Sequence, residues 1–385
     1  MAENLLDAAK SLVPMIRANL DRIDSECQLP PELATAMAQK GLFGLYVPKV
    51  LGGPESDPIT AFHVVEEISK VDGSTGWCSF NGTALTSAVS RITIEAAKEL
   101  FGDPPDVRGS GSARSGGTAK VVPGGYLLKG RWNYLSGIDH AKCLFLNCDV
   151  IDDNGPVMSE DGSQLTRVAV VPLEDGIVHL NWDTMGMRGT ASNDAEYLDL
   201  FVPTSHTYSR MEPGFHDNPL YNPQTAILMS WTLAAANALG MARGSMDAFM
   251  KMATTGSTNS TTLLRDRSTV QTTVGECEAM IGAGKSYVLS AVGAMWESQV
   301  GRKPDLMDKA VHARLAIAYA IRQSVKVVEM LFYVAGTGAI HQSNGLERFF
   351  RDLHVSGQHI SGLHSNYELG GQVLLGAAPS PSLYA

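Results

Sequence analysis

The residues best suited to chemistry lie in two short runs that combine an aromatic ring, hydroxyls and glycine. Trp132 and Ser136-Gly137 lie in Gly-Arg-Trp-Asn-Tyr-Leu-Ser-Gly, and Arg188-Gly189-Thr190-Ala191-Ser192 follows later. Hydroxyls and backbone N–H groups can hydrogen-bond the heteroatom edge of a planar ring or a phosphate, and an indole can pack against the ring. Hydroxyls also satisfy turns and strand ends, so the pattern alone leaves a structural role open.

Two glycine-containing runs look like nucleotide-binding loops but lack the required pattern. Residues 281–286 end in Gly-Lys-Ser, yet Ala279 stands where a phosphate-binding loop needs its first glycine, and the segment has a helical pattern. Gly109-Ser110-Gly111 has Arg114 where a dinucleotide fingerprint needs its third glycine, and a strand pattern follows. We expect no ATP or NAD site here, and no His, Cys or Asp spacing predicts a metal site.

Length, charge and cysteine content narrow the class of protein. The 385 residues suggest two or three domains, and a formal charge of −10 without a dense Lys/Arg run argues against nucleic acid as a partner. Five scattered cysteines without a Cys-x-x-Cys pair suit a reducing compartment. The N-terminus has no uninterrupted apolar run typical of a secretory signal, and no stretch reaches the ~20 apolar residues that span a bilayer. We therefore expect a cytoplasmic protein that uses no membrane.

The period of the apolar residues divides the chain into three parts. Residues 1–107 follow a helical period, and residues 108–222 change to short alternating segments at 119–122, 126–129, 143–150, 165–171 and 196–201. Residues 223–385 return to a helical period over 231–250, 268–299, 306–337 and 345–359. The prediction is an α+β protein with an N-terminal helical domain, a central β domain and a C-terminal helical bundle with a tail.

Four ordered parts of the chain resemble the acyl-CoA dehydrogenase superfamily, and together they run nearly end to end. They are 41–48 with 72–77, the Gly-Gly-Tyr-x-Leu-x-Gly-x-Trp-x-x-x-Ser-Gly-x-x-His-Ala pattern at 124–141, residues 182–193 with Phe201-Val202-Pro203, and 336–338 with 346–352 and Gln358-His359. The resemblance implies a central β-barrel or sandwich, a C-terminal four-helix bundle, and a homotetramer with each flavin at a subunit interface.

The second half of the 124–141 pattern resembles the two-component, group D flavin-dependent monooxygenase branch of that superfamily. This branch includes the oxygenase components of 4-hydroxyphenylacetate and 3-HSA hydroxylases and dibenzothiophene monooxygenase. Dehydrogenases of the superfamily need a carboxylate base, which in many members stands nine residues after the Arg of Arg-Asp. Counting from Arg351 reaches Ile360, beside His359, so an imidazole stands next to the place of the acid.

The resemblance to this branch implies a catalytic His359 that exchanges protons near neutral pH, with Ser136 at the flavin N5. The expected chemistry is oxygenation of a small organic, possibly aromatic, substrate by reduced FMN and O2 through a C4a-hydroperoxyflavin. A separate NAD(P)H:flavin reductase would supply the FMN, and FAD is the alternative cofactor.

The remaining site residues are predicted in two groups. The flavin is expected to contact Trp132, Ser136, Gly137, Arg188, Thr190, Ser192, Arg265, Arg267, Gly336, Gly338 and Gln358. The substrate is expected to contact Ser110, Ser112 and Trp77. A histidine of phenol-hydroxylating relatives is replaced near Leu85, which leaves sulfur or nitrogen oxygenation open.

Two other functions stay open. The first is an FAD-dependent acyl-CoA dehydrogenase with a displaced base, for which Glu368 in Tyr-Glu-Leu-Gly is the candidate. The second is a helical scaffold that binds a ligand or partner without catalysis.

Overall fold

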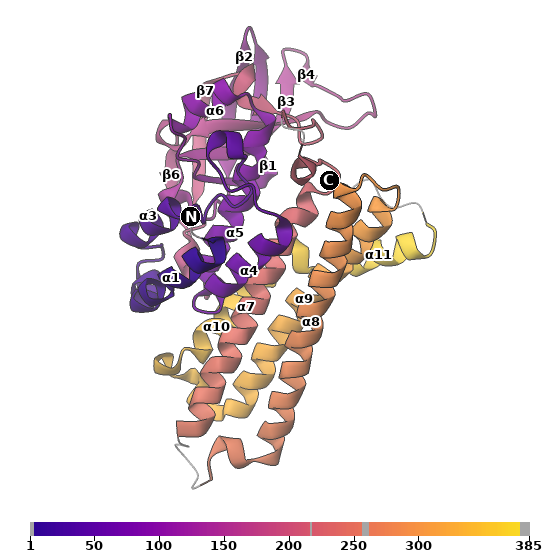
Figure 1. Ribbon diagram of the computed structural model, residues 1–385. Coiled ribbons are helices and arrows are strands. Elements are labelled where there is room, and N and C mark those ends of the chain that lie inside the picture. Colours follow the sequence, from indigo (N-terminus) through magenta and orange to yellow (C-terminus); the bar gives the residue numbers. More distant parts are fainter. Residues whose placement is uncertain (1–3, 216–217, 256–261, 378–385) are drawn as a thin grey trace.

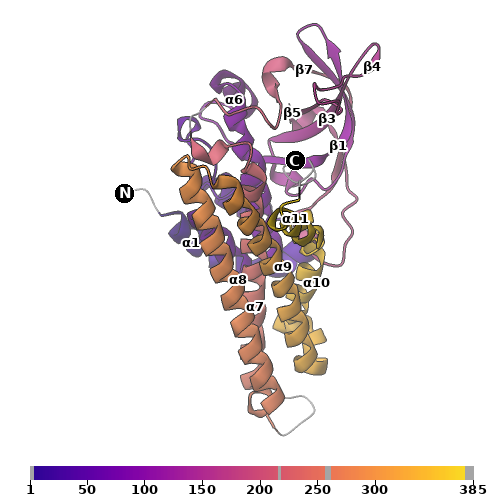
Figure 2. The same cartoon turned by 90° about the vertical axis from the view of Figure 1, so that its right-hand side faces the viewer.

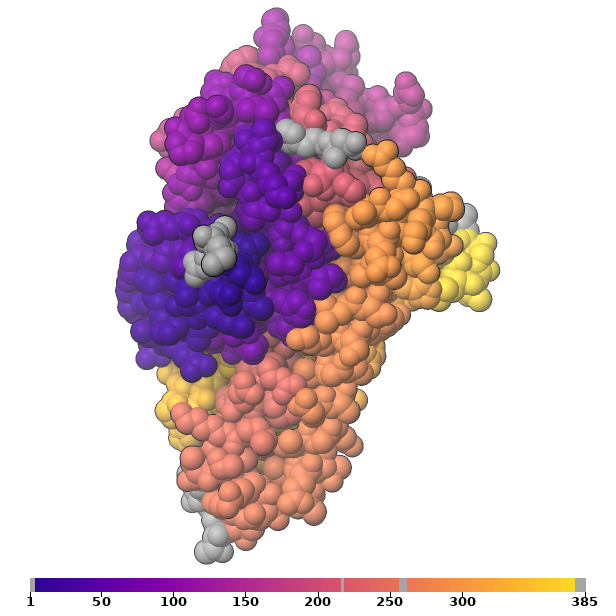
Figure 3. Space-filling model, viewed as in Figure 1, coloured from indigo at the N-terminus to yellow at the C-terminus, as the bar shows by residue number. Residues whose placement is uncertain are grey.

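The computed structural model describes residues 4–215, 218–255 and 262–377, and it places a β-sheet at one end of a long helical bundle (Figure 1). Six helices precede the sheet in sequence; the first five lie beside the junction of the two parts, and the sixth packs on the sheet (Figure 1 and Figure 3). They are α1 (Leu5–Ala18), α2 (Leu20–Ser25), α3 (Pro31–Gln39), α4 (Pro58–Ser69), α5 (Gly73–Thr86) and α6 (Ile94–Phe101).

Aspartates start the two helices that carry the N-terminal core. Asp57 precedes Pro58, and its carboxylate accepts from the backbone N–H groups of Ile59 and Thr60, both at 3.0 Å. Asp72 accepts from the backbone N–H and the hydroxyl of Thr75, both at 2.7 Å. An acidic cap satisfies N–H groups that lack a partner inside the helix, so both residues fix where α4 and α5 begin.

The β part is one mixed sheet of eight strands. Its main path runs β6-β7-β2-β1-β3-β5-β8, and β4 pairs with β3 alone. The strands are β1 (Gly109–Val122), β2 (Gly125–Trp132), β3 (Cys143–Asp152), β4 (Gly155–Pro156), β5 (Thr166–Pro172), β6 (Ile177–His179), β7 (Asp194–Pro203) and β8 (Thr207–Tyr208). The resemblance implies a barrel or a sandwich, and the strands of the described ranges form one continuous sheet.

The first half of β1 is a strand that alternation of apolar residues does not predict. It reads Gly-Ser-Gly-Ser-Ala-Arg-Ser-Gly-Gly and pairs in parallel with β3. A Cβ added to Gly111 would lie 2.2 Å from the carbonyl oxygen of Phe145, so only glycine allows β1 to lie this close to β3. The close approach brings Ser110 into the interior of the protein.

The bundle consists of four helices whose ranges the sequence predicts closely. They are α7 (Ala226–Thr255), α8 (Ser268–Val300), α9 (Leu306–Ala335) and α10 (Leu346–Ser356), and the short α11 (Ser365–Leu374) packs on α9 (Figure 2). The predicted boundaries at 107/108 and 222/223 fall between α6 and β1 and just before α7. No helix in the described ranges has both the length and the apolarity to cross a membrane.

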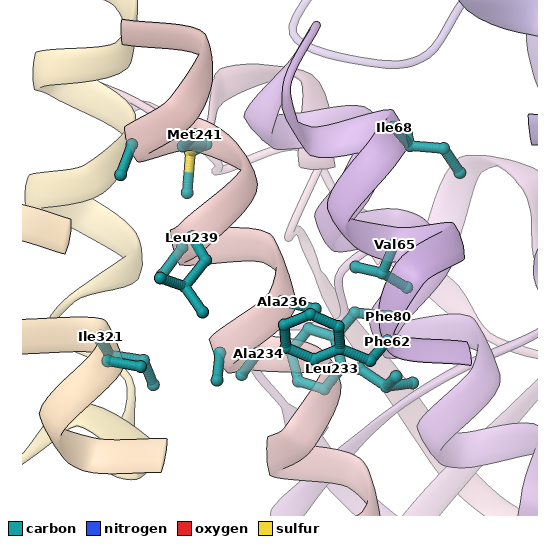
Figure 4. Packing of buried hydrophobic residues seen from close by; sticks show 14 of the residues in the cluster. Phe62, Val65, Ile68, Phe80, Leu233, Ala234, Ala236, Leu239, Met241 and Ile321 are labelled. Atoms are coloured by element: carbon teal, nitrogen blue, oxygen red, sulfur yellow. The ribbon is translucent and has the colours of Figure 1, made fainter. Parts of the chain in front are cut away.

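Helix α7 lies between the N-terminal helices and the rest of the bundle. Phe62 and Val65 of α4 face Leu233 and Ala236 of α7 on one side, while Ile321 of α9 lies on the other (Figure 4). All five side chains are at most 2% exposed. One apolar core therefore joins the N-terminal helices to the bundle.

Truncation of Leu239, at the centre of α7, tests this shared core. Leu239 is 1% exposed, and Leu239→Ala should lower the free energy of unfolding by about 2–5 kcal/mol because it leaves a cavity. Leu375→Ala, at a side chain that is 87% exposed, should change it by less than about 0.5 kcal/mol. Denaturant unfolding followed by circular dichroism measures both, and equal effects would contradict a core centred on α7.

Candidate active site

A chain of hydrogen bonds joins an indole to three hydroxyls where α5, the sheet and the loop before β7 meet. Trp77 Nε1 donates to Ser136 Oγ at 3.1 Å, and Ser136 Oγ lies 2.7 Å from Ser192 Oγ. Ser192 Oγ lies 2.7 Å from Thr190 Oγ1, which donates to the carbonyl oxygen of Met187 at 2.8 Å. The hydroxyl chain, as we call these groups, brings together four predicted site residues from three parts of the sequence.

The backbone around Ser136 is held from two elements. Its carbonyl oxygen accepts from Ser110 Oγ of β1 at 2.9 Å and from Asn81 Nδ2 of α5 at 2.8 Å. Gly137 has φ +79°, and its N–H donates to the carbonyl oxygen of Thr190 at 2.7 Å. Since a Cβ on Gly137 would lie 2.9 Å from the ring of His140, glycine is required there. Ser136 is thus a preorganised group that keeps 7% of its surface exposed.

His359 lies against the indole that bonds Ser136. Its ring is edge-on to Trp77, with centroids 5.3 Å apart, and edge-on to Phe80 at 6.0 Å. Its Nδ1 accepts from the backbone N–H of Ser361 at 3.4 Å and lies 2.7 Å from Ser361 Oγ. A backbone N–H can only donate, so in the neutral ring the hydrogen is carried on Nε2.

Burial lowers the pKa of His359 to about 4. The sequence leaves open whether the imidazole that hydrogen-bonds a peroxide and exchanges protons near pH 7 is neutral or charged. In the folded protein the ring is neutral at that pH, so it presents an Nε2–H donor and not a positive charge.

Two buried carboxylates lie beside this site, on α5 and α10. Asp352 Oδ1 accepts from the backbone N–H of Met187 at 2.5 Å, and Asp72 caps α5. A Cβ on Gly73 would lie 3.1 Å from Asp352 Oδ2, which places Asp352 against the first turn of α5. Burial and the nearby charge of Asp72 raise the pKa of Asp352 to about 7.

Arg188 and Trp132 make structural hydrogen bonds that the sequence does not predict. The Arg188 guanidinium donates to the carbonyl oxygens of Asp24 at 2.9 Å and Thr184 at 3.1 Å, and to Cys27 Sγ at 3.0 Å. Three of its five N–H groups therefore hold the N-terminal helices to the 184–192 segment. Trp132 is 0% exposed, and its Nε1 donates to the carbonyl oxygen of Asn147 at 2.7 Å inside the sheet. A ring so enclosed cannot form a wall for a ligand.

Four predicted flavin contacts lie far from Ser136 within one chain. Arg265 and Arg267 stand at the start of α8, at the end of the bundle remote from the sheet (Figure 1). Gly338 packs against the last turns of α7, where its Cβ would lie 3.3 Å from Met252 Sδ, and Gly336 immediately follows α9. In a single subunit these four residues cannot share a ligand with the hydroxyl chain.

The other predicted residues lie closer to the site. Gln358 is exposed beside His359, and its Nε2 donates to the carbonyl oxygen of His354 at 3.4 Å. Ser112 is 9% exposed, and its Oγ accepts from the backbone N–H of Arg114 at 3.3 Å. Glu368, the candidate base of a dehydrogenase, is exposed on α11, where its Oε1 accepts from Gln372 Nε2 at 3.5 Å. Within the described ranges, Ser136, Ser192 and His359 make no hydrogen bond to a carboxylate.

Sequence reasoning misses three residues of the site. Asn81 follows Trp77 by four residues on α5, so the helical period places both on one face and could have identified it. Phe80 packs edge-on against Trp77 at 4.9 Å. Tyr134 is 58% exposed and has φ +60°, a left-handed conformation that a sequence pattern does not reveal.

A surface hollow between α1 and α3 is separate from this site. It is lined by Leu5, Ala8, Ala36, Gln39 and Lys40. These residues combine short apolar side chains with an amide and one amine, a set without a nucleophile or an acid–base pair. The hydroxyl chain and His359 therefore remain the strongest candidate for chemistry.

Comparison with known proteins places the chain in a family. Residues 3–102 match the acyl-CoA dehydrogenase N-terminal domain, and residues 232–362 match the acyl-CoA dehydrogenase C-terminal domain. The indole-3-acetate monooxygenase of Acinetobacter baumannii is 26% identical, over 95% of this chain and 92% of that one. The flavin-dependent monooxygenase oxygenase subunit HsaA of Mycobacterium tuberculosis is 27% identical, over 96% of each.

Solved structures agree over almost the whole chain. The 3-HSA hydroxylase from Rhodococcus sp. RHA1 has a TM-score of 0.89 at 25% identity and covers 99% of each chain. XiaF from Streptomyces sp., solved with FADH2 and glycerol, has a TM-score of 0.87 at 26% identity and covers 97% of this chain and 96% of that one. These similarities confirm the helix, sheet and bundle architecture and the flavin-dependent monooxygenase class.

The pH dependence of stability tests the buried carboxylate of Asp352. A raised pKa means that the folded protein holds the proton more tightly than the unfolded chain, whose carboxyl has a value near 3.8. Stability from this group is therefore complete below about pH 4 and is lost as the pH rises through about 7. Asp352→Asn keeps a neutral side chain, so its free energy of unfolding should rise relative to that of the native protein between pH 5 and 7, by at most about 1.4 kcal/mol per pH unit, and the difference should level off above pH 7.

Denaturant unfolding across this pH range measures that difference. Asp153→Asn is the control, because Lys120 lowers the pKa of the exposed Asp153 and its titration ends below this range. If the free energies of unfolding of the native protein and of Asp352→Asn change in parallel with pH, Asp352 is ionised in the folded protein throughout this range and its pKa is not raised.

Proposed function

We propose that the chain, which belongs to the acyl-CoA dehydrogenase superfamily and is a flavin-dependent monooxygenase within it, is an oxygenase component. It would receive reduced FMN from a separate reductase. It would use O2 to oxygenate a small aromatic compound. One observation supports this most: an imidazole, and not an acid, packs on the indole that hydrogen-bonds Ser136. Many dehydrogenases of the superfamily have their carboxylate base at this locus.

The residues present fit a flavin ring. Ser136 offers a hydroxyl to a ring nitrogen, while the half-buried Trp77 and the exposed Tyr134 supply aromatic surface. Ser192 is hydrogen-bonded to both Ser136 and Thr190, so these two hydroxyls hold Ser136 in place and would not contact the flavin directly. When bound, the reduced flavin supplies the electrons that activate O2. FMN is the proposed form, and the FADH2 in the XiaF structure makes FAD the alternative.

His359 would act as a neutral hydrogen-bond donor. Its Nδ1 is occupied by Ser361, which leaves the Nε2–H for oxygen atoms bound beside the flavin. Because the ring is enclosed by Trp77 and Phe80, water is partly excluded from this donor, and a hydrogen bond in such surroundings is stronger than in bulk water. His359 can thus hold an oxygen in place without introducing a charge.

The substrate is proposed to be aromatic because Trp77 presents a half-buried indole at this place. Phe80 packs edge-on behind that indole, and Tyr134 from the turn after β2 is exposed; aromatic surface of this kind binds planar molecules by stacking and edge contacts. Ser110 is fully buried in its bond to the Ser136 carbonyl, so it would shape the substrate site and not touch the substrate. The indole-3-acetate monooxygenase among the relatives makes indoles the first compounds to test.

We also propose a cytoplasmic homotetramer. Arg265, Arg267, Gly336 and Gly338 lie at the far end of the bundle, so they could contact a flavin only in a neighbouring subunit. Guanidinium groups bind phosphate through paired donors, which suits the phosphate of that flavin.

His359→Ala tests the proposed role of the imidazole. The affinity for reduced FMN should stay within about threefold, because His359 contacts the site through Trp77 and Phe80 and not through Ser136. Loss of a catalytic donor typically costs 10²–10⁴-fold, so incorporation of labelled O2 into indole-3-acetate should fall at least about 100-fold, with H2O2 released instead. Mass spectrometry and a peroxide assay, with a flavin reductase supplying FMN, measure both products.

His364→Ala provides the matched control. His364 is exposed five residues later, packs on Tyr367 and should tolerate the change without effect. If the native protein couples flavin oxidation to product and His359→Ala does so equally well, the proposed role is wrong.

A further inference from the structure

The hydroxyl chain behind Ser136 has fixed ends. Trp77 Nε1–H can only donate, and the carbonyl oxygen of Met187 can only accept. Between them, Ser136, Ser192 and Thr190 each hold one hydrogen. On these facts, and resting on the proposed function, we infer that Thr190 and Ser192 set the hydrogen-bonding polarity of Ser136 and so make the site prefer reduced over oxidised flavin.

Counting hydrogens shows why the polarity is fixed. The chain has four bonds and four hydrogens, one from the indole and one from each hydroxyl. The first bond must take the hydrogen of Trp77, and the last must take that of Thr190. Ser192 must then donate to Thr190, and Ser136 must donate to Ser192. This is the one arrangement that makes all four bonds.

The arrangement leaves Ser136 as an acceptor. Its hydrogen points to Ser192, one lone pair accepts from Trp77, and one lone pair remains for a ligand. Ser136 is 7% exposed, whereas Ser192 and Thr190 are 4% and 1% exposed. Ser136 is therefore the hydroxyl of the hydroxyl chain that still reaches the surface. A ligand that offers a hydrogen to Ser136 is therefore favoured.

The two redox states of a flavin differ at one atom in this respect. N5 of the reduced ring carries a hydrogen and can donate, whereas N5 of the oxidised ring has only a lone pair and must accept. To donate outward to the oxidised ring, Ser136 must take its hydrogen away from Ser192, and one bond of the hydroxyl chain is lost whichever hydroxyls rotate. If the lost bond is the one from Thr190, the Met187 carbonyl keeps Trp182 Nε1 at 3.0 Å and the Thr190 N–H at 3.2 Å. The reversal thus loses a single hydrogen bond, which corresponds to a preference of about three- to tenfold.

Thr190→Val should remove the fixed polarity. Valine matches the shape of threonine but has no hydroxyl, so Ser192 loses its acceptor and can either donate to Ser136 or accept from it. Either direction makes one bond between the two serines, so Ser136 can donate to the oxidised ring or accept from the reduced ring without losing a bond. Ser192→Ala removes the link altogether, which also frees the Ser136 hydroxyl to turn either way and should abolish the preference.

The experiment measures the dissociation constants of oxidised and reduced FMN for the full chain, the first by fluorescence quenching and the second by anaerobic titration. The ratio of the oxidised to the reduced constant should fall about three- to tenfold in both Thr190→Val and Ser192→Ala, which corresponds to loss of the native preference. A tenfold change in this ratio corresponds to about 30 mV in the two-electron potential of the bound flavin. A purely structural role would weaken both states alike and leave the ratio unchanged.

Thr232→Val is the matched control. The Thr232 hydroxyl is 0% exposed and donates to the carbonyl oxygen of Leu228 at 2.8 Å within α7, remote from the hydroxyl chain. The ratio of the dissociation constants of oxidised and reduced FMN should be the same for Thr232→Val as for the native protein. If Thr190→Val folds as Thr232→Val does and its ratio stays within twofold of native, the inference is wrong. Should Thr190→Val fail to fold, an unchanged ratio in Ser192→Ala overturns it equally.

The same titrations separate this inference from the proposed function. A native protein that binds neither state of FMN overturns the proposed function and the inference with it. A native protein that prefers reduced FMN, with an unchanged ratio in both variants, overturns only the role of the hydroxyl chain.

Discussion

The backbone of Met187 makes the two contacts on which the site depends. Its N–H donates to the buried carboxylate of Asp352 at 2.5 Å, and its carbonyl oxygen ends the hydroxyl chain. Met187 has φ +55°, a left-handed conformation that is uncommon for a residue with a side chain and has a strain cost on the order of 1 kcal/mol. The two hydrogen bonds offset that cost, so the last long helix of the bundle and the hydroxyls beside the sheet hold the same residue.

Close packing on both sides keeps this peptide in place. A Cβ on Gly186 would lie 2.4 Å from the backbone of Arg351 on α10, and one on Gly189 would lie 2.2 Å from Ile23 of α2. Arg188 between them donates to the backbone of Asp24. The 186–192 segment is therefore wedged between the N-terminal helices and α10, and a shift of either would move Thr190 and Ser192. Rigidity of this kind is what a preorganised hydrogen-bonding site requires.

The sequence predicts the architecture well because long helices and alternating strands repeat a period. The four bundle helices were predicted within a few residues of their ends, whereas the glycine-rich start of β1 was not predicted to be a strand because it lacks alternation. Trp132 and Tyr134 illustrate the limit for the site. Two residues apart, they would share one face of a regular strand, but the left-handed φ of Tyr134 turns it outward while Trp132 stays buried. Likewise, nothing in the run around Arg188 reveals that Asp24 and Cys27 take its donors, because that contact joins distant parts of the chain.

Rapid mixing tests most directly whether an imidazole-bearing site in this fold performs oxygenation. The full chain, saturated with reduced FMN without oxygen, is mixed with oxygenated buffer while the near-ultraviolet and visible spectra are recorded. We expect a transient that absorbs in the near ultraviolet and decays to oxidised FMN more slowly than the free reduced flavin is oxidised. Direct oxidation without such a transient would contradict it, as would tightly held FAD that is reduced by an acyl-CoA.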